Sequence, residues 1–305
     1  MRIVFMGTPA FAVPSLARLA DEHEVAAVVT APDKPAGRGQ IPTPSPVKIF
    51  AQNAGLPLIQ PENLEEPAFV EQLRALNADL GVVVAFRKLP EAVFSAPRLG
   101  SINLHASLLP DYRGAAPIQW AVINGETLSG LTTFFIEPAI DTGKILLQTP
   151  VPIPEHFTAG DLHDRMQTVG AELLSQTLRE LESGRLEARA QDPALAVHKA
   201  PKIFPAHCDV RFDAPARKIV DLIRGLSPAP GARTLVAGKT LKIYFARPVY
   251  DLRPEAGGIV VENEKLFIGA ADGAVQIVEA QWEGRKRMPV QELLRGARFP
   301  NRVDE

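Results

Sequence analysis

Short apolar segments alternate with helical segments through the first two thirds of this 305-residue chain. Residues 2–6 and 25–30 have the composition of strands, and residues 10–20 between them have that of a helix. Two strands connected through a helix run parallel, because the crossover returns the chain to the same end of the sheet. The alternation continues as far as a long amphipathic helix at residues 162–183. This pattern predicts a Rossmann-like α/β domain with a parallel sheet and helices on both of its faces.

The pattern changes near residue 190. Prolines recur and the periodicity fades from residue 191 to 206, which indicates a linker. After one helix over residues 214–226, the chain consists of short strand-like runs separated by turns, followed by a last helix. A chain of this length also exceeds what one ordinary core supports. We therefore predict a first domain at residues 1–189, a linker at residues 190–206 and a smaller β-barrel of OB-like type at residues 207–305.

Composition excludes several classes of site. The single cysteine, Cys208, excludes an internal disulfide and a multi-cysteine metal site. No G-x-G-x-x-G or Walker motif follows the first strand, so neither a dinucleotide nor ATP is indicated. The N-terminal sequence does not have the pattern of a signal peptide, and the apolar run at residues 80–86 is far shorter than the roughly 20 residues that span a bilayer. We expect a cytoplasmic protein without a membrane partner.

The net charge of −2 is unevenly distributed along the chain. Residues 205–305 carry 16 Lys and Arg against 13 Asp and Glu, whereas residues 1–204 carry 17 against 22. The second part is therefore mildly basic, and it contains the run Arg285-Lys286-Arg287. On charge alone, such a run is more often a solvated turn than a nucleic-acid contact, and both interpretations stay open.

Residues 31–47 include five prolines and two glycines. This composition excludes a helix or a central strand. A surface connection would explain it, but long loops are uncommon in compact domains, and Lys34 and Arg38 lie within this one. We therefore favour a functional loop.

Two polar side chains share one face of an apolar strand. Asn103 and His105 are two residues apart, so on a strand both point to the same side. Either local hydrogen bonds satisfy them or they face a ligand. Asp141, in the loop at residues 137–143, is a third candidate, although a simple turn also explains it. A hydrolase that uses Ser107 lacks the G-x-S-x-G motif, and no second His or Cys lies at metal-ligand spacing.

Several collinear motifs then allow a comparison with a known family. The first domain contains VFMGTPAFAVPSL, PAGRG with PSPVK, INLHASLLPDYRGAAPIQWAVINGE and DTGKILLQ, and the second part contains APKIF, LIRGLSP and KRMPVQELLRGARF. Together these motifs closely resemble the folate-dependent formyltransferases, in particular the members that act on methionyl-initiator tRNA. The resemblance covers nearly the whole chain, and it implies a formyltransferase domain followed by a tRNA-binding β-barrel domain.

The resemblance implies a role for individual residues. The family's catalytic Asn, His and Asp fall on Asn103, His105 and Asp141. Its folate-contacting turn falls on Ser107, Leu108, Leu109 and Pro110. The residues implied to contact tRNA are Lys34 and Arg38 in the loop at residues 34–48, together with Arg285, Lys286 and Arg287 in the second domain. The implied formyl donor is 10-formyltetrahydrofolate, the implied acceptor is methionyl-initiator tRNA, and a monomer without a metal ion is expected.

The residue types suit this chemistry. The α-amine of the esterified methionine attacks the formyl carbon, and negative charge develops on the formyl oxygen. Aligned N–H donors from Asn103 and His105 would stabilise that charge, by about 3 kcal/mol each. A carboxylate from Asp141 would orient His105 and help to remove the proton of the amine.

Two alternatives stay open. One is a folate-dependent formyltransferase that acts on a nucleotide-linked amino sugar, which would use the same three residues. The other is an inactive RNA-binding protein with the same fold. The β-rich second domain favours tRNA over the sugar, and the three polar residues together favour an enzyme. One departure from the family pattern is the segment at residues 85–90, which is shorter and carries Arg87 and Lys88.

Overall fold

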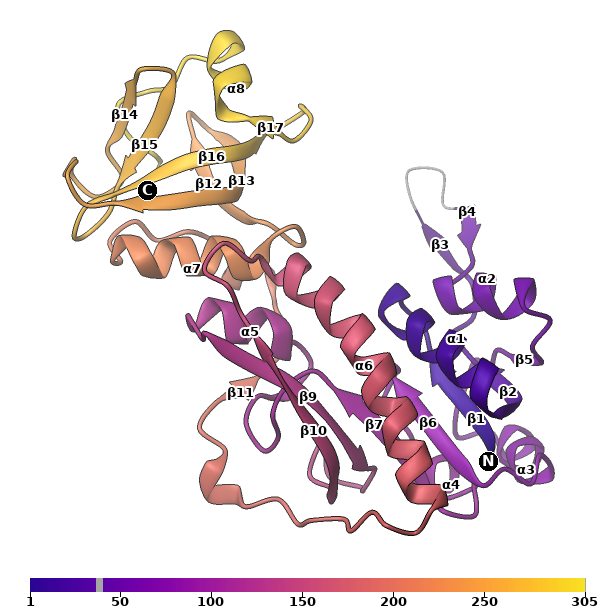
Figure 1. Ribbon diagram of the computed structural model, residues 1–305. Coiled ribbons are helices and arrows are strands. Elements are labelled where there is room, and N and C mark those ends of the chain that lie inside the picture. Colours follow the sequence, from indigo (N-terminus) through magenta and orange to yellow (C-terminus); the bar gives the residue numbers. More distant parts are fainter. Residues whose placement is uncertain (37–40, 305) are drawn as a thin grey trace. The chain divides into compact units, whose positions relative to one another are not determined.

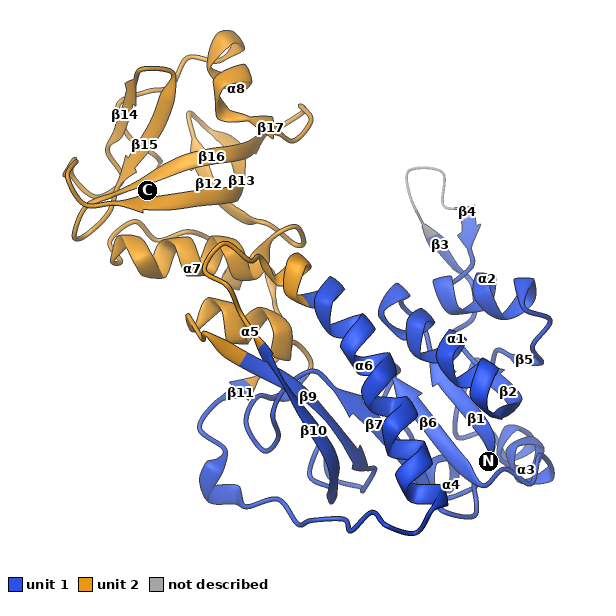
Figure 2. Ribbon diagram, viewed as in Figure 1, with its two compact units in different colours: residues 1–114, 129–151, 163–199 blue, residues 115–128, 152–162, 200–305 orange. Residues whose placement is uncertain are grey.

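The computed structural model describes residues 1–36 and 41–304. The chain forms two compact units, shown in Figure 2, and each unit is built from more than one stretch of the sequence. Unit 1 contains residues 1–114, 129–151 and 163–199, and unit 2 contains residues 115–128, 152–162 and 200–305. The domain boundaries expected at residues 189 and 206 stay a prediction.

Unit 1 is organised around a seven-stranded sheet with the order β10-β9-β7-β6-β1-β2-β5 (Figure 1). These strands are β1 (Arg2–Gly7), β2 (Glu24–Val29), β5 (Leu58–Ile59), β6 (Leu80–Val84), β7 (Ser101–His105), β9 (Leu128–Phe135) and β10 (Ile145–Pro152). The strands from β5 to β7 are parallel. Strand β9 pairs antiparallel with β7, so the sheet is mixed at this edge. The predicted Rossmann-like α/β fold is confirmed.

Helices cover both faces of this sheet. On one face, Gly170 of α6 (Ala159–Glu182) lies against β7, and a Cβ added to Gly170 would be 2.7 Å from Leu104 Cδ2. On the other face, α3 (Pro67–Ala75) and α4 (Glu91–Phe94) pack on the apolar side chains of β1 and β6. Side chains alternate along β7, so Asn103 and His105 belong to this second face.

The remaining short elements of the first 200 residues surround the sheet. They are η1 (Ala10–Ala12), α1 (Val13–Glu22), α2 (Pro46–Asn53), β8 (Arg113–Gly114), η2 (Pro193–Leu195) and β11 (Lys199–Ala200). The proline-rich segment forms a ribbon of β3 (Lys34–Ala36) and β4 (Ile41–Thr43), which are antiparallel to each other and lie outside the main sheet. Within the described part of residues 31–47, both strands lie outside the main sheet, and α2 begins at Pro46.

Unit 2 contains an antiparallel, barrel-like sheet. Its strand order is β12-β13-β16-β15-β14, and β17 pairs with β16. The strands are β12 (Ala232–Val236), β13 (Lys239–Val249), β14 (Ile259–Glu262), β15 (Lys265–Gly269), β16 (Ala274–Trp282) and β17 (Met288–Pro289). Asn263 and Glu264 both have positive φ in the tight turn that connects β14 with the antiparallel β15.

The helices of unit 2 are α5 (Pro117–Ile123), η3 (Pro205–Cys208), α7 (Ala216–Leu226) and α8 (Val290–Gly296). Helix α7 contributes Ile219, Ile223 and Leu226 to the core beneath the sheet. It also packs closely on α5, since a Cβ added to Gly225 would be 2.4 Å from Ile123 Cγ1. No helix among the residues that the structure describes is both long and apolar enough to cross a membrane.

Candidate active site

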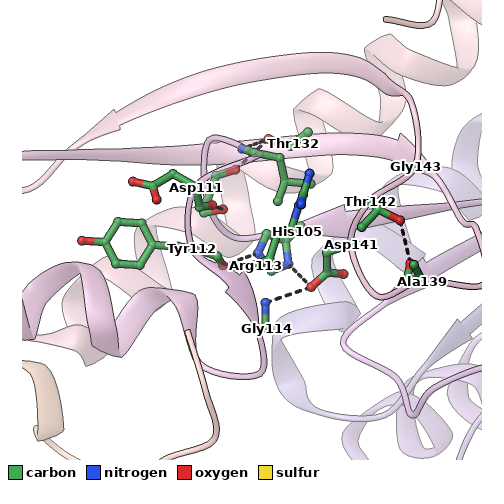
Figure 3. Close-up of polar contacts among 12 residues, drawn as sticks. His105, Asp111, Tyr112, Arg113, Gly114, Thr132, Ala139, Asp141, Thr142 and Gly143 are labelled. Carbon is green, nitrogen blue, oxygen red and sulfur yellow. Dashed lines mark hydrogen bonds and ion pairs between the residues drawn. The ribbon is translucent and has the colours of Figure 1, made fainter. Parts of the chain in front are cut away.

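His105 is the last residue of β7, and its two ring nitrogens face different groups (Figure 3). Nε2 is 2.9 Å from the carbonyl oxygen of Tyr112. Because a carbonyl only accepts hydrogen bonds, Nε2 carries a proton and donates it. Nδ1 is 3.7 Å from Oδ2 of Asp141. His105 is 6% exposed, so its imidazole is buried. The hydrogen bond to the Tyr112 carbonyl determines which nitrogen faces the carboxylate.

Asp141 lies in the loop that connects β9 and β10. Its Oδ2 accepts a hydrogen bond from the backbone N–H of Gly114 at 3.0 Å. The residue has a φ of +54°, a conformation that L residues seldom adopt. Two residues further on, a Cβ added to Gly143 would be 1.7 Å from the carbonyl oxygen of Phe135. The loop therefore approaches β9 too closely for any side chain at that position.

Asn103 is half-buried and lies two residues before His105 on the same face of β7. All three candidates lie within unit 1, and Nδ1 of His105 lies 3.7 Å from Oδ2 of Asp141. Among the described residues, no group of three or more His, Cys, Asp or Glu side chains has the arrangement of a metal site. The groups that this site offers for chemistry are a carboxylate, an imidazole and an amide.

The turn at residues 107–110 is held by side chains of β9 and β10. Thr132 donates its hydroxyl proton to the carbonyl of Ser107 at 2.7 Å and accepts from the N–H of Leu109 at 3.1 Å. Gln148 donates to the carbonyl of Leu109 at 2.9 Å. These three hydrogen bonds constrain the backbone of the turn. The peptide bond between Leu109 and Pro110 is cis.

Most side chains of that turn point into the protein. Ser107 is fully buried, and its hydroxyl donates to the carbonyl of Asp111 at 2.6 Å. Leu109 packs with Phe134 and Ile145, and Leu108 is only partly buried. The Ser107 and Leu109 carbonyls and the Leu109 N–H are already hydrogen-bonded, so the partly buried Leu108 is the side chain of this turn that is most open to a ligand.

The basic candidates differ in their contacts. Lys34 is exposed at the start of β3, whereas Arg38 lies outside the described residues. In unit 2, Arg285 donates to the carbonyl of Gly296 at 2.8 Å. Lys286 is exposed, and none of the hydrogen bonds or ion pairs found among the described residues includes its side chain.

Arg287 is also exposed, but it is engaged in a fixed pair. Its Nε and Nη2 atoms donate to the two carboxylate oxygens of Glu279, at 2.7 and 2.6 Å. The centre of its guanidinium lies 4.5 Å from the ring centroid of Tyr244. The hydrogen bonds with Glu279 raise the pKa of Arg287 above its ordinary value. Its charge is partly neutralised, so Lys286 is the least engaged cation of the run.

Arg87 occupies the segment where the sequence departs from the family pattern. Its guanidinium donates to the backbone carbonyls of Pro61 and Glu62 and stacks on the ring of Phe86. Burial lowers the pKa of this guanidinium. Arg87, in the segment after β6, therefore connects to the segment after β5 through these hydrogen bonds.

Sequence reasoning did not identify several groups that build the site. They are the Tyr112 carbonyl, the Gly114 N–H, and the side chains of Thr132, Gln148 and Gln191. The first two are backbone groups, whose positions cannot be predicted from residue type. Gln148 and Thr132 stand on strands whose other residues are mainly apolar, and that contrast is a usable signal.

Two family models match the chain. The model described as "Formyl transferase" matches residues 1–178, and the model described as "Formyl transferase, C-terminal domain" matches residues 202–298. A relative named methionyl-tRNA formyltransferase, from Bacteroides thetaiotaomicron, is 46% identical over 310 residues. That match covers 98% of this chain and 96% of the relative.

Solved structures show the same fold at low identity. HypX from Aquifex aeolicus, determined with tetrahydrofolic acid, is 19% identical with a TM-score of 0.68. The match covers 96% of this chain but only 47% of HypX. The N-formyltransferase from Helicobacter canadensis, determined with folinic acid and dTDP-3-aminofucose, is 21% identical with a TM-score of 0.68. There the match covers 92% of this chain and 98% of the other.

Proposed function

The chain belongs to the formyl transferase family, and from that membership we propose that it transfers a formyl group from 10-formyltetrahydrofolate to the α-amine of methionyl-initiator tRNA. The observation that carries this function is the match to a methionyl-tRNA formyltransferase, which extends over both parts of the chain at 46% identity. The product, formylmethionyl-tRNA, would supply translation initiation.

The amino-sugar alternative has weaker support. The N-formyltransferase from Helicobacter canadensis, determined with dTDP-3-aminofucose, shares the fold, but its 21% identity carries no substrate assignment. The relative that acts on methionyl-tRNA is more than twice as similar in sequence. The range that matches the C-terminal domain of the family, residues 202–298, includes the basic run at residues 285–287.

Asp141 is proposed to receive the proton of the attacking amine. An amine attacks a carbonyl carbon only through its free electron pair, so its ammonium form must first lose a proton to a base. The carboxylate of Asp141 is fixed by the Gly114 N–H through Oδ2. Its side chain keeps 12% exposure, so it is reachable from outside while largely shielded from bulk water. A general base needs this combination of access and fixed orientation.

Asn103 and His105 are proposed to stabilise the negative charge on the formyl oxygen. The Nε2–H of His105 is already used by the Tyr112 carbonyl, so Nδ1 is the ring nitrogen available to the reaction. When Nδ1 is protonated it can donate to the developing oxyanion or to Asp141. The carboxamide of Asn103 lies on the same strand face and supplies a second donor.

The turn formed by Ser107, Leu108, Leu109 and Pro110 is proposed to contact the folate. Lys34, Arg38, Arg285, Lys286 and Arg287 are proposed to contact tRNA. One chain carries all of these residues, so a monomer is the proposed functional form, and the cytoplasm, where charged tRNA is used, is the proposed location.

A comparison of acceptors tests the function. The purified protein is incubated with 10-formyltetrahydrofolate and either methionyl-initiator tRNA or a nucleotide-linked amino sugar. The expected result is formylmethionine after deacylation of the tRNA and no formylated sugar. Turnover of the sugar without any formylated tRNA would transfer the function to the alternative.

A further inference from the structure

Residues 189–198 lie against the loop that follows β9, although most of them belong to the segment predicted to be a linker. Arg189 and Ile145 exchange two backbone hydrogen bonds of 2.8 Å, which places the segment beside the start of β10. The segment up to Lys199 belongs to unit 1. It continues past two of the loops that build the candidate site, and it contacts each of them.

The first contact is made by Gln191. Its Nε2 donates to the carbonyl oxygens of Asp141 at 2.9 Å and of Gly143 at 2.8 Å. Its Oε1 accepts from Nε and Nη2 of Arg113, at 3.0 and 2.5 Å. Both amide protons and the carbonyl of this half-buried side chain are therefore used, and together they connect the Asp141 loop to the residue before Gly114.

The second contact is made by His198. Its backbone N–H and its Nδ1 lie 2.5 and 3.0 Å from the two carboxylate oxygens of Asp111. Its carbonyl accepts from the N–H of Tyr112 at 3.0 Å, and the two rings stack with centroids 4.9 Å apart. Tyr112 is the residue whose carbonyl accepts the proton of His105 Nε2.

Both anchored residues have unusual backbone conformations. Asp141 and Tyr112 have φ values of +54° and +56°. Such conformations cost about 1 kcal/mol or more for an L residue and persist only where the surroundings enforce them. Hydrogen bonds help to enforce both conformations: Gln191 donates to the carbonyl of Asp141, and the carbonyl of His198 accepts from the N–H of Tyr112.

We propose that residues 189–198 form a brace for the catalytic pair, in which Gln191 and His198 are positioning residues. Gln191 sets the place of the Asp141 carboxylate, and His198 sets the place of the Tyr112 carbonyl and so of the His105 ring. This inference rests on the proposed formyl transfer, because it assigns these residues to the same site.

The test uses Gln191→Leu, which keeps the size of the side chain and removes all four hydrogen bonds. A shift of the Asp141 loop by about 1 Å is expected to lower kcat by about 10- to 100-fold, while KM for both substrates stays within about 3-fold. Gln176→Leu is the matched control. Gln176 is an exposed glutamine of α6 whose side chain donates a hydrogen bond to Glu180, far from the candidate residues in sequence, so the kcat of this variant is expected to be that of the wild type.

Coupling to Asp141 separates positioning from a general loss of structure. If Gln191 acts through Asp141, Gln191→Leu lowers kcat by less than about 3-fold in an Asp141→Asn background, because coupled residues are not additive. Gln191→Glu removes the two donated bonds and keeps an acceptor for Arg113, so it replaces the leucine variant if that variant does not fold. His198→Leu removes the Nδ1 contact with Asp111 and the ring stacking on Tyr112 but keeps the backbone hydrogen bonds, so a smaller fall in kcat is expected.

The outcomes are distinguishable. Absence of tRNA formylation by the wild-type protein would reject the proposed function itself. With an active wild type, a Gln191 variant of unchanged kcat would overturn the brace. So would losses that multiply in the double variant with Asp141→Asn.

Discussion

The two ring nitrogens of His105 have different partners, and this difference limits what the residue can do. Nε2 is 2.9 Å from the Tyr112 carbonyl, which leaves Nδ1 toward Asp141 at 3.7 Å. The latter separation exceeds that of a normal hydrogen bond, so the two groups do not saturate each other, and a third group is proposed to lie against both. The proposed third group is the reacting amine or the formyl oxygen.

Asn103 can be tested separately from this pair. Asn103→Ala removes one donor from the proposed oxyanion site and is expected to lower kcat by about 10²- to 10³-fold. The KM for each substrate should change little, because the donor acts mainly on charge that develops during the reaction. Steady-state kinetics with each substrate varied in turn measures both quantities. A large rise in KM with unchanged kcat would instead make Asn103 a substrate-binding residue.

At the scale of elements, strand β7 was the most predictable part of the site. Its apolar residues and the two-residue spacing of Asn103 and His105 predicted a buried strand with both side chains on one face, and the fold agrees. The place of Asp141 depended on the family resemblance, because a loop residue has no periodicity. Gln191 was not predicted at all, since it lies in an irregular, proline-rich segment where local sequence carries no information about distant loops.

The position of the loop between β9 and β10 can be tested by a substitution at Gly143. A Cβ added to Gly143 would be 1.7 Å from the Phe135 carbonyl, so Gly143→Ala must displace the loop that holds Asp141. We expect kcat to fall by about 10²-fold, since misplacement by about 1 Å has this effect.

The control for this substitution is Gly55→Ala. Gly55 has a φ of +66° and nothing within 4 Å of an added Cβ. The Gly55→Ala variant should therefore lose about 1 kcal/mol of stability because of the positive φ, and it should keep the kcat of the wild type. Chemical denaturation and kinetics of both variants compare the two effects, and a fully active Gly143→Ala would show that the loop position is not critical.

At the scale of the whole molecule, the two units carry different parts of the proposed function. The candidate catalytic residues belong to unit 1, and the basic run at residues 285–287 belongs to unit 2. The switch in the sequence from alternating helices and strands to mainly strands predicted the change from an α/β to a β-rich architecture. The sequence did not reveal that residues 115–128 and 152–162 contribute to unit 2, because their periodicity resembles that of the flanking segments.

Because tRNA is a polyanion, its affinity for this protein should depend on the salt concentration. The logarithm of the tRNA association constant should fall linearly with the logarithm of salt concentration, with a slope of about −0.7 to −0.9 per phosphate contact. Lys286→Ala should make the slope shallower by about one contact. Arg287→Ala should have a smaller effect, because Glu279 already partners that arginine. Filter binding over a range of salt concentrations measures the slopes, and an affinity independent of salt would contradict tRNA recognition.

The most direct test of the central claim is a single-turnover measurement with methionyl-initiator tRNA and 10-formyltetrahydrofolate, made on the wild-type protein and on Asp141→Asn. The asparagine keeps an acceptor for the Gly114 N–H but is not a base, so the variant should fold and bind both substrates. We predict that the wild type forms formylmethionyl-tRNA and that the variant forms it about 10²- to 10⁴-fold more slowly. Equal rates for the two proteins, or no formylated tRNA from the wild type, would contradict the account.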